Sequence, residues 1–342
     1  MGVAAAIAAA GIWAMSAAMM GSQTSRMDAM SISAIRAFWA GVFFVVLLFA
    51  TGENAEIGEM SAWIIAQLIL SALIGLAIGD TLYVVSIARL GMNRAFPISI
   101  GLFAIFSFAL SAAVLGESVG VLTIIGAALV LAGVYFVAVF GRAQEPDAEI
   151  EASAVQGDHP DPPPRHPPIA GGADITGSID IAVESPLSFV ERAKHLLFNP
   201  HSPGFGLLIL VVAAMFWAIA TVWLRDASSG FSAISVGALR IPAAGAFLGV
   251  AVFSQPSASL RRRAVPRRSM SVLTIAGVVG TGVGSLLFIY AVQEAGAGKT
   301  AVLSSISPLF ALPLSVLFLG EKITRWLLLG TALAVVGIIL LA

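Results

Sequence analysis

The two halves of this chain repeat each other, because rare residues recur in the same order at a nearly constant distance. One set recurs after 204 residues: Trp13 and Trp217, Arg36 and Arg240, Gly116-Glu117 and Gly320-Glu321, Gly126 and Gly330, and Gly133 and Gly337. Another set recurs after 205 residues: Gly75 and Gly280, Gly79 and Gly284, Leu82 and Leu287, Gly91 and Gly296, and Arg94 and Lys299. An ordered series repeated at one period indicates a duplication. We therefore expect two copies of one structural unit.

Each copy contains five apolar stretches that are long enough to cross a membrane. A helix needs about 17 to 25 residues to span ~30 Å of hydrocarbon. Ten such stretches can be drawn, at residues 3–21, 31–50, 62–88, 96–115, 119–140, 205–224, 232–253, 270–292, 300–319 and 323–342. With 58% hydrophobic and 11% charged residues, the composition excludes a soluble globular domain. The sequence also lacks the alternating ten-residue segments of an outer-membrane barrel.

These observations predict an all-α integral membrane protein with ten transmembrane helices, arranged as two inverted five-helix repeats. The inversion follows because an odd number of spans in the first copy turns the second copy upside down. Inverted repeats are typical of secondary transporters. We expect a multi-pass protein of a cell membrane, specifically the inner membrane of a bacterium. The first stretch lacks the positive residues that begin a signal peptide, so we interpret it as an uncleaved span.

A polar segment separates the two copies. Residues 142–204 are rich in Pro, Asp, Glu, Gly and Ser, a composition that predicts a mostly disordered linker between a first repeat at 1–141 and a second at 205–342. Near its end, apolar residues at 189–197 have helical spacing. This stretch is either a short amphipathic helix on the membrane surface or an ordinary part of the linker.

The basic residues of the loops predict the orientation. If the N-terminus lies outside, the inside loops apart from the linker carry ten Arg and Lys residues, against two outside, Arg225 and Lys299. Cytoplasmic loops are enriched in basic residues. We therefore expect both termini outside and the linker in the cytoplasm.

Several short motifs occur in the same order in both halves. The first half has Ala10-Gly-Ile-Trp-Ala, Ala34-Ile-Arg-Ala, Gly79-Asp-Thr-Leu-Tyr83, Arg89-Leu-Gly-Met-Asn-Arg94 and Leu115-Gly-Glu117, and the second has Phe216-Trp-Ala, Ala238-Leu-Arg240, Tyr290-Ala-Val, Ser304-Ser-Ile-Ser-Pro-Leu-Phe310 and Leu319-Gly-Glu-Lys322. In this series, which covers everything except the linker, the chain resembles the EamA-type transporters of the drug/metabolite transporter superfamily. The resemblance implies a ten-helix basket with a central cavity, lined mainly by the first four spans of each half, that moves small metabolites.

Three charged residues lie inside the predicted spans, where a charge is unfavourable unless it is paired or faces water. Arg36 lies close enough to the start of its span for its side chain to reach the lipid headgroups. The alternative is that its side chain faces the cavity. Arg240 lies deeper in its predicted span. Asp80 follows Gly79, and its counterpart in the second half is Ser285. Asp80 either binds a substrate ammonium or the coupling proton in the cavity, or it forms a structural ion pair with Arg36 or a helix-dipole contact.

Aromatic and hydroxyl side chains complete the predicted substrate site. Packing and interfacial anchoring are alternative roles for the aromatic residues, and helix association for the serines. The full set of candidate substrate-binding residues is Trp13, Arg36, Asp80, Tyr83, Ser99, Trp217, Arg240, Tyr290, Ser304 and Ser307. Pro308, beside the last two serines, would free a backbone carbonyl at membrane depth. The glycines Gly126, Gly133, Gly330 and Gly337 predict close helix packing.

Enzymatic chemistry has no support in the sequence. The chain has no cysteine, and its four histidines all fall in the polar segment, so no metal, no cofactor and no catalytic residues are expected. The net charge of −1 gives no sign of nucleic-acid binding. The predicted function is secondary transport, in the direction of export, of amino-acid-like or amphiphilic metabolites by alternating access, with the lipid bilayer and a proton as further partners. Alternatives are a membrane scaffold or sensor that uses the linker, and a transporter of phosphorylated anions. The oligomeric state is left open.

Overall fold

A computed structural model describes residues 1–117, 120–140, 203–260, 262, 265–307, 309–310 and 325–341. The predicted linker lies outside the described residues except for residues 203 and 204, which already belong to a helix, and Pro308 and residues 311–324 lie outside them too. Within the described ranges every regular element is helical. The predicted all-α fold is confirmed, and the count of ten spans stays a prediction because the ninth span runs into residues that are not described.

The described helices follow the predicted spans closely. In the first half they are α1 (Gly2–Gly21), α2 (Ala29–Thr51), α3 (Asn54–Glu59), α4 (Ala62–Ala72), η1 (Leu73–Gly79), α5 (Asp80–Leu90), α6 (Met92–Val114) and α7 (Val121–Phe140). In the second half they are α10 (Pro203–Ala227), α11 (Ala233–Ser254), α12 (Arg267–Ile275), η2 (Ala276–Val283), α13 (Gly284–Ala295), α14 (Ala297–Ser304) and α16 (Arg325–Leu341). Seven helical segments of the described chain are long and apolar enough to cross a membrane, and α7 and α16 contain shorter apolar stretches.

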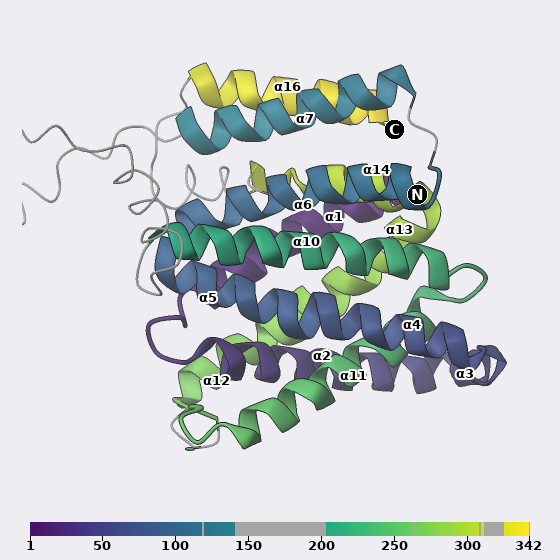
Figure 1. Cartoon of the computed structure of the whole chain (residues 1–342), viewed down its shortest axis with the longest axis vertical. Coiled ribbons are helices and arrows are strands. Elements are labelled where there is room, and N and C mark those ends of the chain that lie inside the picture. The colour runs from purple at the N-terminus through teal and green to yellow at the C-terminus, as the bar shows by residue number, and fades with distance from the viewer. Residues whose placement is uncertain are drawn as a thin grey trace, which may run out of the picture.

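The two halves run in opposite directions through the bundle. In Figure 1, α1 begins at the end where both termini lie, whereas α10 begins at the opposite end. The antiparallel pairs α2 with α11 and α7 with α16 contact each other directly. Their relation is that of inverted repeats.

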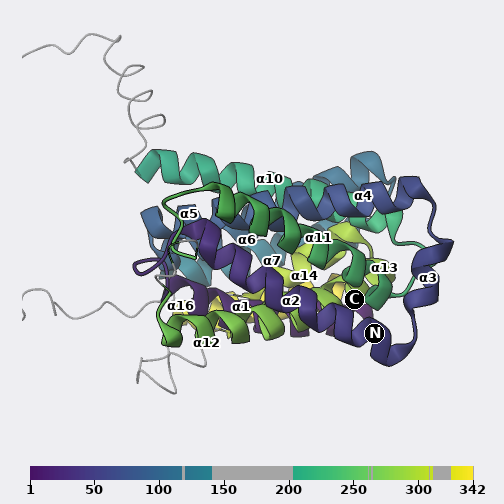
Figure 2. The same cartoon turned by 90° about the horizontal axis from the view of Figure 1, so that it is seen from below.

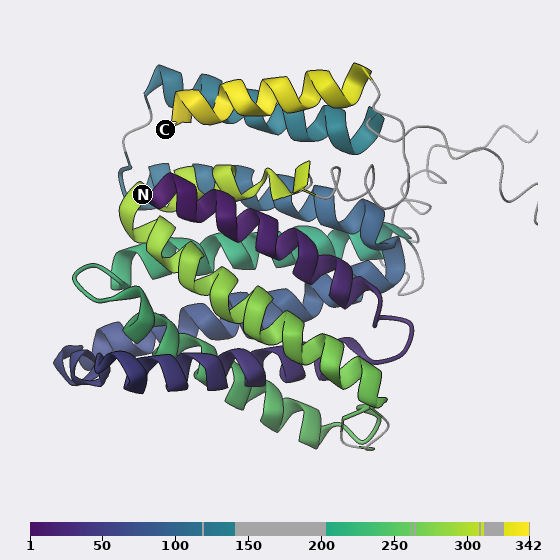
Figure 3. The same ribbon diagram turned by 180° about the vertical axis from the view of Figure 1, so that it is seen from behind.

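Each half packs its first helix against the third span of the other half. Helix α10 contacts α4, η1 and α5, and α1 contacts η2 and α13. The pairing of α10 with α4 and α5 is at the front of Figure 1, and the pairing of α1 with α13 is at the front of the reverse view in Figure 3. Figure 2 shows these two layers from below, with α2 and α11 nearest the viewer. Because each first helix packs against the third span of the other half, the two halves meet in the middle of the bundle.

Duplicated glycines also bring α7 and α16 into close contact, and they do so reciprocally. A Cβ on Gly133 of α7 would lie 2.5 Å from the Gly330 carbonyl of α16, and a Cβ on Gly337 of α16 would lie 2.6 Å from the Gly126 carbonyl of α7. Because Gly126 and Gly330 are counterparts, the two contacts are related by the two-fold symmetry of the repeats. The predicted role of these four glycines in close helix packing is confirmed.

The third span of each half is interrupted by a π-helical segment, which the sequence did not predict. Segment η1 begins seven residues before Asp80, and η2 begins nine residues before its counterpart Ser285. Single π-helical turns inside α-helices are frequent at functional sites. Both segments are rich in glycine, so the neighbouring half can approach their backbones closely.

Carboxylates fasten the halves to each other at both ends of the bundle. Near one end, Glu117 accepts hydrogen bonds from the backbone N–H groups of Ala297 (2.8 Å) and Gly298 (3.1 Å), which begin α14. At the other end, Asp28 accepts from the N–H of Ser31 (2.9 Å), capping α2, and from the N–H of Ser259 in the other half (2.7 Å). Burial alone would raise the pKa of Asp28, but these hydrogen bonds outweigh it and the pKa lies below its usual value. The Gly-Glu motif thus has a structural use, a helix cap supplied by the opposite half.

The two ends of the bundle differ in charge, as the prediction of orientation from the basic residues of the loops requires. The α1–α2, α5–α6 and α11–α12 connections, beside which Arg26, Arg89 and Arg267 lie, are at the end of the bundle opposite the termini in Figure 1. The acidic helix α3 lies at the end of the termini. Reporter fusions are expected to place Ala342 outside and Gly172 inside the cell. A cytoplasmic signal from a fusion at Ala342 would contradict the orientation.

Candidate functional site

A cavity lies at the junction of the two halves. Its empty space measures about 880 Å³, with the open solvent at its mouth included. Residues of α1, α2, η1, α5 and α6 line it together with residues of α10, α11, η2 and α13. The cavity therefore has walls from the first four spans of the first half and the first three of the second.

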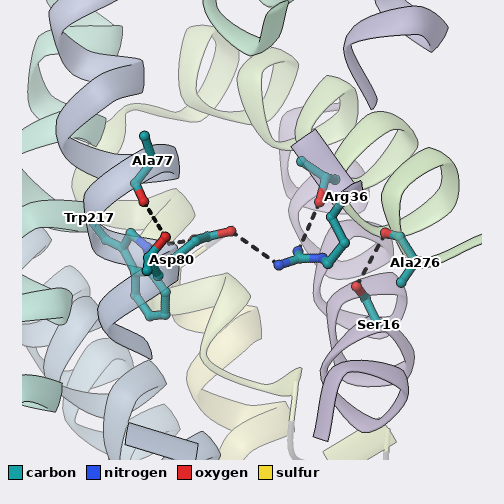
Figure 4. A network of polar contacts seen from close by, with 8 residues as sticks. Ser16, Arg36, Ala77, Asp80, Trp217 and Ala276 are labelled. Atoms are coloured by element: carbon teal, nitrogen blue, oxygen red, sulfur yellow. Dashed lines mark hydrogen bonds and ion pairs between the residues drawn. The ribbon is translucent and has the colours of Figure 1, made fainter. Parts of the chain in front are cut away.

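An ion pair crosses the cavity between two helices of the first half. Asp80, at the start of α5, places Oδ2 3.5 Å from Nη1 of Arg36 on α2, and the two side chains are 18% and 8% exposed. Nη2 of Arg36 donates to the Thr281 hydroxyl of η2 at 2.9 Å, and Nε1 of Trp217 donates to Oδ1 of Asp80 at 2.9 Å. Figure 4 shows the Asp80 carboxylate between Trp217 and Arg36. One carboxylate is thus held by a cation of its own half and by an indole of the other.

The interpretation of Arg36 as a headgroup-directed side chain is wrong. Arg36 is 6% exposed and lines the cavity, as does Arg240, which is also 6% exposed. Arg36 is the seventh residue after the start of α2 at Ala29, and Arg240 is the seventh after the start of α11 at Ala233. Both therefore lie about 10 Å along their helices, and the predicted difference in depth between them is not observed.

Arg240 lacks the acidic partner that Arg36 has. Its Nε donates to the Ser71 hydroxyl of α4 at 3.0 Å. Among the described residues, the Arg36–Asp80 pair is the one salt bridge, so no described carboxylate lies within salt-bridge distance of Arg240. The counterpart of Asp80 in the second half is Ser285, which also lines the cavity. The positions of the two arginines are thus related by the repeat, but within the described part of the chain only Arg36 has a carboxylate as a partner.

Two tryptophans pack reciprocally on glycines where the π-helical segments end, at Gly79, the last residue of η1, and at Gly284, the residue that follows η2. A Cβ on Gly79 would lie 3.0 Å from Cδ1 of Trp217, and a Cβ on Gly284 would lie 2.8 Å from Nε1 of Trp13. The rings also pair with aromatic residues of the opposite half: Trp217 with Tyr83 at 5.1 Å between centroids, and Trp13 with Phe288 at 4.9 Å. Phe103 contacts both Trp217 (6.1 Å) and Phe288 (6.2 Å). These rings give the cavity a continuous apolar wall.

Six of the predicted site residues line this one cavity, and four do not. The lining residues are Trp13, Arg36, Asp80, Tyr83, Trp217 and Arg240. Outside the lining, the Ser99 hydroxyl donates to the Phe96 carbonyl at 2.9 Å and the Ser307 hydroxyl to the Ser304 carbonyl at 2.7 Å. Tyr290 and Ser304 are also absent from the lining. The structure therefore brings the charged and most of the aromatic candidates together. It leaves Ser99 and Ser307 bonded to nearby backbone carbonyls and the buried Ser304 hydroxyl without a hydrogen-bond partner among the described residues.

The sequence interpretation missed the two hydroxyls that hold the arginines. Thr281 binds Arg36, and Ser71 binds Arg240. Thr281 had a signal, since it is a hydroxyl within the glycine-rich run of η2. Ser71 had none, because a serine in an apolar helix usually bonds to its own turn, as Ser71 does with the Leu68 carbonyl at 2.7 Å.

The profile of the EamA-like transporter family matches residues 1–139 and 204–342, which is most of the chain and both copies of the repeat. The chain belongs to the EamA-like transporter family. It is therefore a multi-pass membrane protein of a family of transporters, and the resemblance drawn from its motifs is confirmed. The described residues contain no cluster of His, Asp or Glu that could hold a metal ion.

Among curated relatives, this EamA-like chain is similar to exporters of bacteria. It is 29% identical over 137 residues to the pseudopaline exporter CntI of Pseudomonas aeruginosa, covering 39% of this chain and 46% of that one. It is 27% identical over 133 residues to a probable terminal-alkyne amino-acid exporter of Streptantibioticus cattleyicolor, covering 39% and 43%. The chain thus matches a little less than half the length of these relatives.

A solved crystal structure of another protein supports the fold independently. It superposes with a TM-score of 0.66 and covers 99% of this chain and 95% of that one, at 15% sequence identity. At this identity the likeness concerns the fold alone.

Proposed function

We propose that this EamA-like protein exports small amphiphilic or amino-acid-like metabolites through the cavity between its inverted repeats. The observation that carries the proposal is the combination of an aromatic wall with a buried ion pair, Arg36 and Asp80, at the junction of the two halves. In transporters built from inverted repeats, the substrate binds near the middle of the membrane at the repeat interface. Exporters among the relatives support the direction.

Alternating access follows from the same construction. The substrate site is framed by contacts that each half makes with the other, so a rocking of one half against the other opens the cavity to one side and closes it to the opposite side. The carboxylates Glu117 and Asp28 bridge the halves at opposite ends of the bundle. Each of these bridges can form when its own end is closed and break when that end opens.

Asp80 is the proposed coupling residue. It lines the cavity and shares its carboxylate between Arg36 and Trp217, so a proton or a substrate ammonium competes with Arg36 for one oxygen. A charge within the membrane that faces a cavity is a default candidate for such a role. Binding at Asp80 then releases Arg36 from one partner and changes the contacts between α2 and α5.

Flux through proteoliposomes tests the proposal. The purified protein is reconstituted, and uptake of amino acids and of amphiphilic carboxylates is measured with and without a pH gradient. We expect flux above that of empty liposomes for compounds with both an apolar body and a polar head, and a larger flux when the gradient is imposed. Flux equal to that of empty liposomes for the whole panel would contradict the proposal.

A further inference from the structure

We infer that Arg240 is the binding group for a substrate carboxylate, so that the cavity selects apolar metabolites that carry a carboxylate over those that carry only an ammonium. The inference rests on the proposed function, because it names the substrate class of that same cavity. It starts from an asymmetry between the halves. Both halves place an arginine in the cavity lining, but of the residues that the structure describes only the first half provides a carboxylate that pairs with it.

The charge of the cavity favours an anionic group. Arg36, Asp80 and Arg240 are the charged residues among the described ones that line it, so the lining has a net charge of +1 when Asp80 is ionised. A buried charge is stable when it is paired and hydrogen-bonded. Asp80 already has Arg36 and Trp217 as partners. The remaining positive charge belongs to Arg240.

The hydrogen bonds of Arg240 leave its outer edge available. Its Nε is directed to Ser71 on α4, and no hydrogen bond from its two terminal nitrogens is found among the described residues. These two nitrogens are not among the buried polar atoms that lack a partner, although Nε of Arg36 is. They therefore have some surface in the cavity that Arg240 lines. The two parallel N–H groups of a guanidinium edge match the two oxygens of a carboxylate.

The apolar part of the ligand has a place beside this group. Phe288, Trp13 and Phe103 form a wall that reaches across both halves, and Phe288 lies on the same helix, α13, as Ser285, the counterpart of Asp80. Because Ser285 carries no charge, the only carboxylate that the described lining offers a substrate ammonium is Asp80, which Arg36 already pairs. An ammonium without a carboxylate would have to displace Arg36 from Asp80 and would leave Arg240 unpaired.

Three small compounds that share a phenyl ring separate the possibilities. 3-Phenylpropionate has the carboxylate, phenethylamine has the ammonium, and phenylalanine has both. Equilibrium binding of each radiolabelled compound is measured on the purified full-length protein in nanodiscs. We expect 3-phenylpropionate and phenylalanine to bind at least about tenfold more tightly than phenethylamine, since a hydrogen-bonded charge pair contributes a factor of this order.

Variants of Arg240 assign the effect to this residue. Arg240→Gln should weaken binding of both carboxylates by about tenfold or more and leave phenethylamine unchanged or improved, and Arg240→Lys should retain part of the preference. Arg262→Gln is the matched control, because Arg262 lies in the exposed loop before α12 and donates to the Pro256 carbonyl at 3.0 Å. A structural role for Arg240 would instead lower the melting temperature. Removing an unpaired buried charge should leave the melting temperature unchanged or raise it.

Two results would overturn the inference. One is a wild-type binding result, which does not depend on the folding of any variant: either phenethylamine binds as tightly as 3-phenylpropionate, or none of the three compounds binds. The other is an unchanged preference for carboxylates in Arg240→Gln. Carboxylate-selective binding without flux in proteoliposomes would contradict the transport proposal and leave the carboxylate site in place, whereas flux that ignores the carboxylate would contradict this inference alone.

Discussion

Asp80→Asn is expected to reduce gradient-driven transport to the level of empty liposomes. Asparagine keeps the shape of the side chain and an oxygen that accepts from Nε1 of Trp217, which now lies 2.9 Å from Oδ1. It removes the charge that pairs with Arg36 at 3.5 Å. The variant cannot take up a proton, and its cavity carries two uncompensated arginines, Arg36 and Arg240.

The same variant is expected to lose stability, because removal of one partner leaves the other charge buried and unpaired. Such a loss reaches about 3 to 5 kcal/mol for fully buried pairs. The Asp80 side chain is 18% exposed to the cavity, so we expect about 3 kcal/mol at most. The double variant Asp80→Asn with Arg36→Gln should recover the melting temperature and not the transport.

A carboxylate outside the cavity provides the control for Asp80→Asn. Asp226→Asn is the matched control, since Asp226 accepts a hydrogen bond from Gln67 of another span at 2.6 Å, at an exposed position away from the cavity. This variant should transport like the wild type. If the double variant at Asp80 and Arg36 recovered both stability and gradient-driven transport, the pair would be purely structural.

Gly133→Ala is expected to push α7 away from α16 and to destabilise the protein. The added Cβ would lie 2.5 Å from the Gly330 carbonyl oxygen and 2.7 Å from the Ala334 nitrogen. Both are backbone atoms, so no side chain can rotate away to make room. Overpacking of this kind typically destabilises by about 1 to 3 kcal/mol, and the melting temperature measures it.

A second helical glycine provides the comparison. Gly249 lies within α11, and a Cβ there would meet nothing within 4 Å. Gly249→Ala should therefore leave the melting temperature unchanged or raise it, because alanine is favoured over glycine in a helix by about 1 kcal/mol. The counterpart Gly337→Ala should behave like Gly133→Ala, since it meets the Gly126 carbonyl at 2.6 Å. Equal melting temperatures for the Gly133 and Gly249 variants would contradict the close packing.

The architecture was predictable because the features that determine it are properties of the sequence itself. The offset between Trp13 and Trp217, and the odd number of apolar stretches in the first copy, predict an inverted repeat without any contact being known. The glycine pairs of α7 and α16 were predictable for the same reason. The π-helical segments were not, because a shift from i→i+4 to i→i+5 hydrogen bonding inside a helix leaves the apolar pattern of the span intact.

The candidate site was predictable where a residue is costly to place in a membrane. Arg36, Asp80 and Arg240 stood out for this reason and all three line the cavity. The serines Ser99 and Ser307 did not stand out in this way, because a hydroxyl can bond to the carbonyl of its own helix, as both do. Which hydroxyl meets which arginine depends on the rotation of helices in opposite halves, and a single sequence carries no measure of that rotation.

The central claim is that one cavity, shared by the inverted repeats, opens to each side of the membrane in turn. The chain has no cysteine, so Ser285→Cys introduces a single thiol at a residue that lines the cavity and is close in size to the serine it replaces. Its modification by a small, membrane-impermeant methanethiosulfonate is measured in right-side-out and in inside-out membrane vesicles. We predict modification from both sides, with the rates from the two sides shifted in opposite directions by 3-phenylpropionate. Modification from one side only, at a rate that the compound does not change, would contradict alternating access through this cavity.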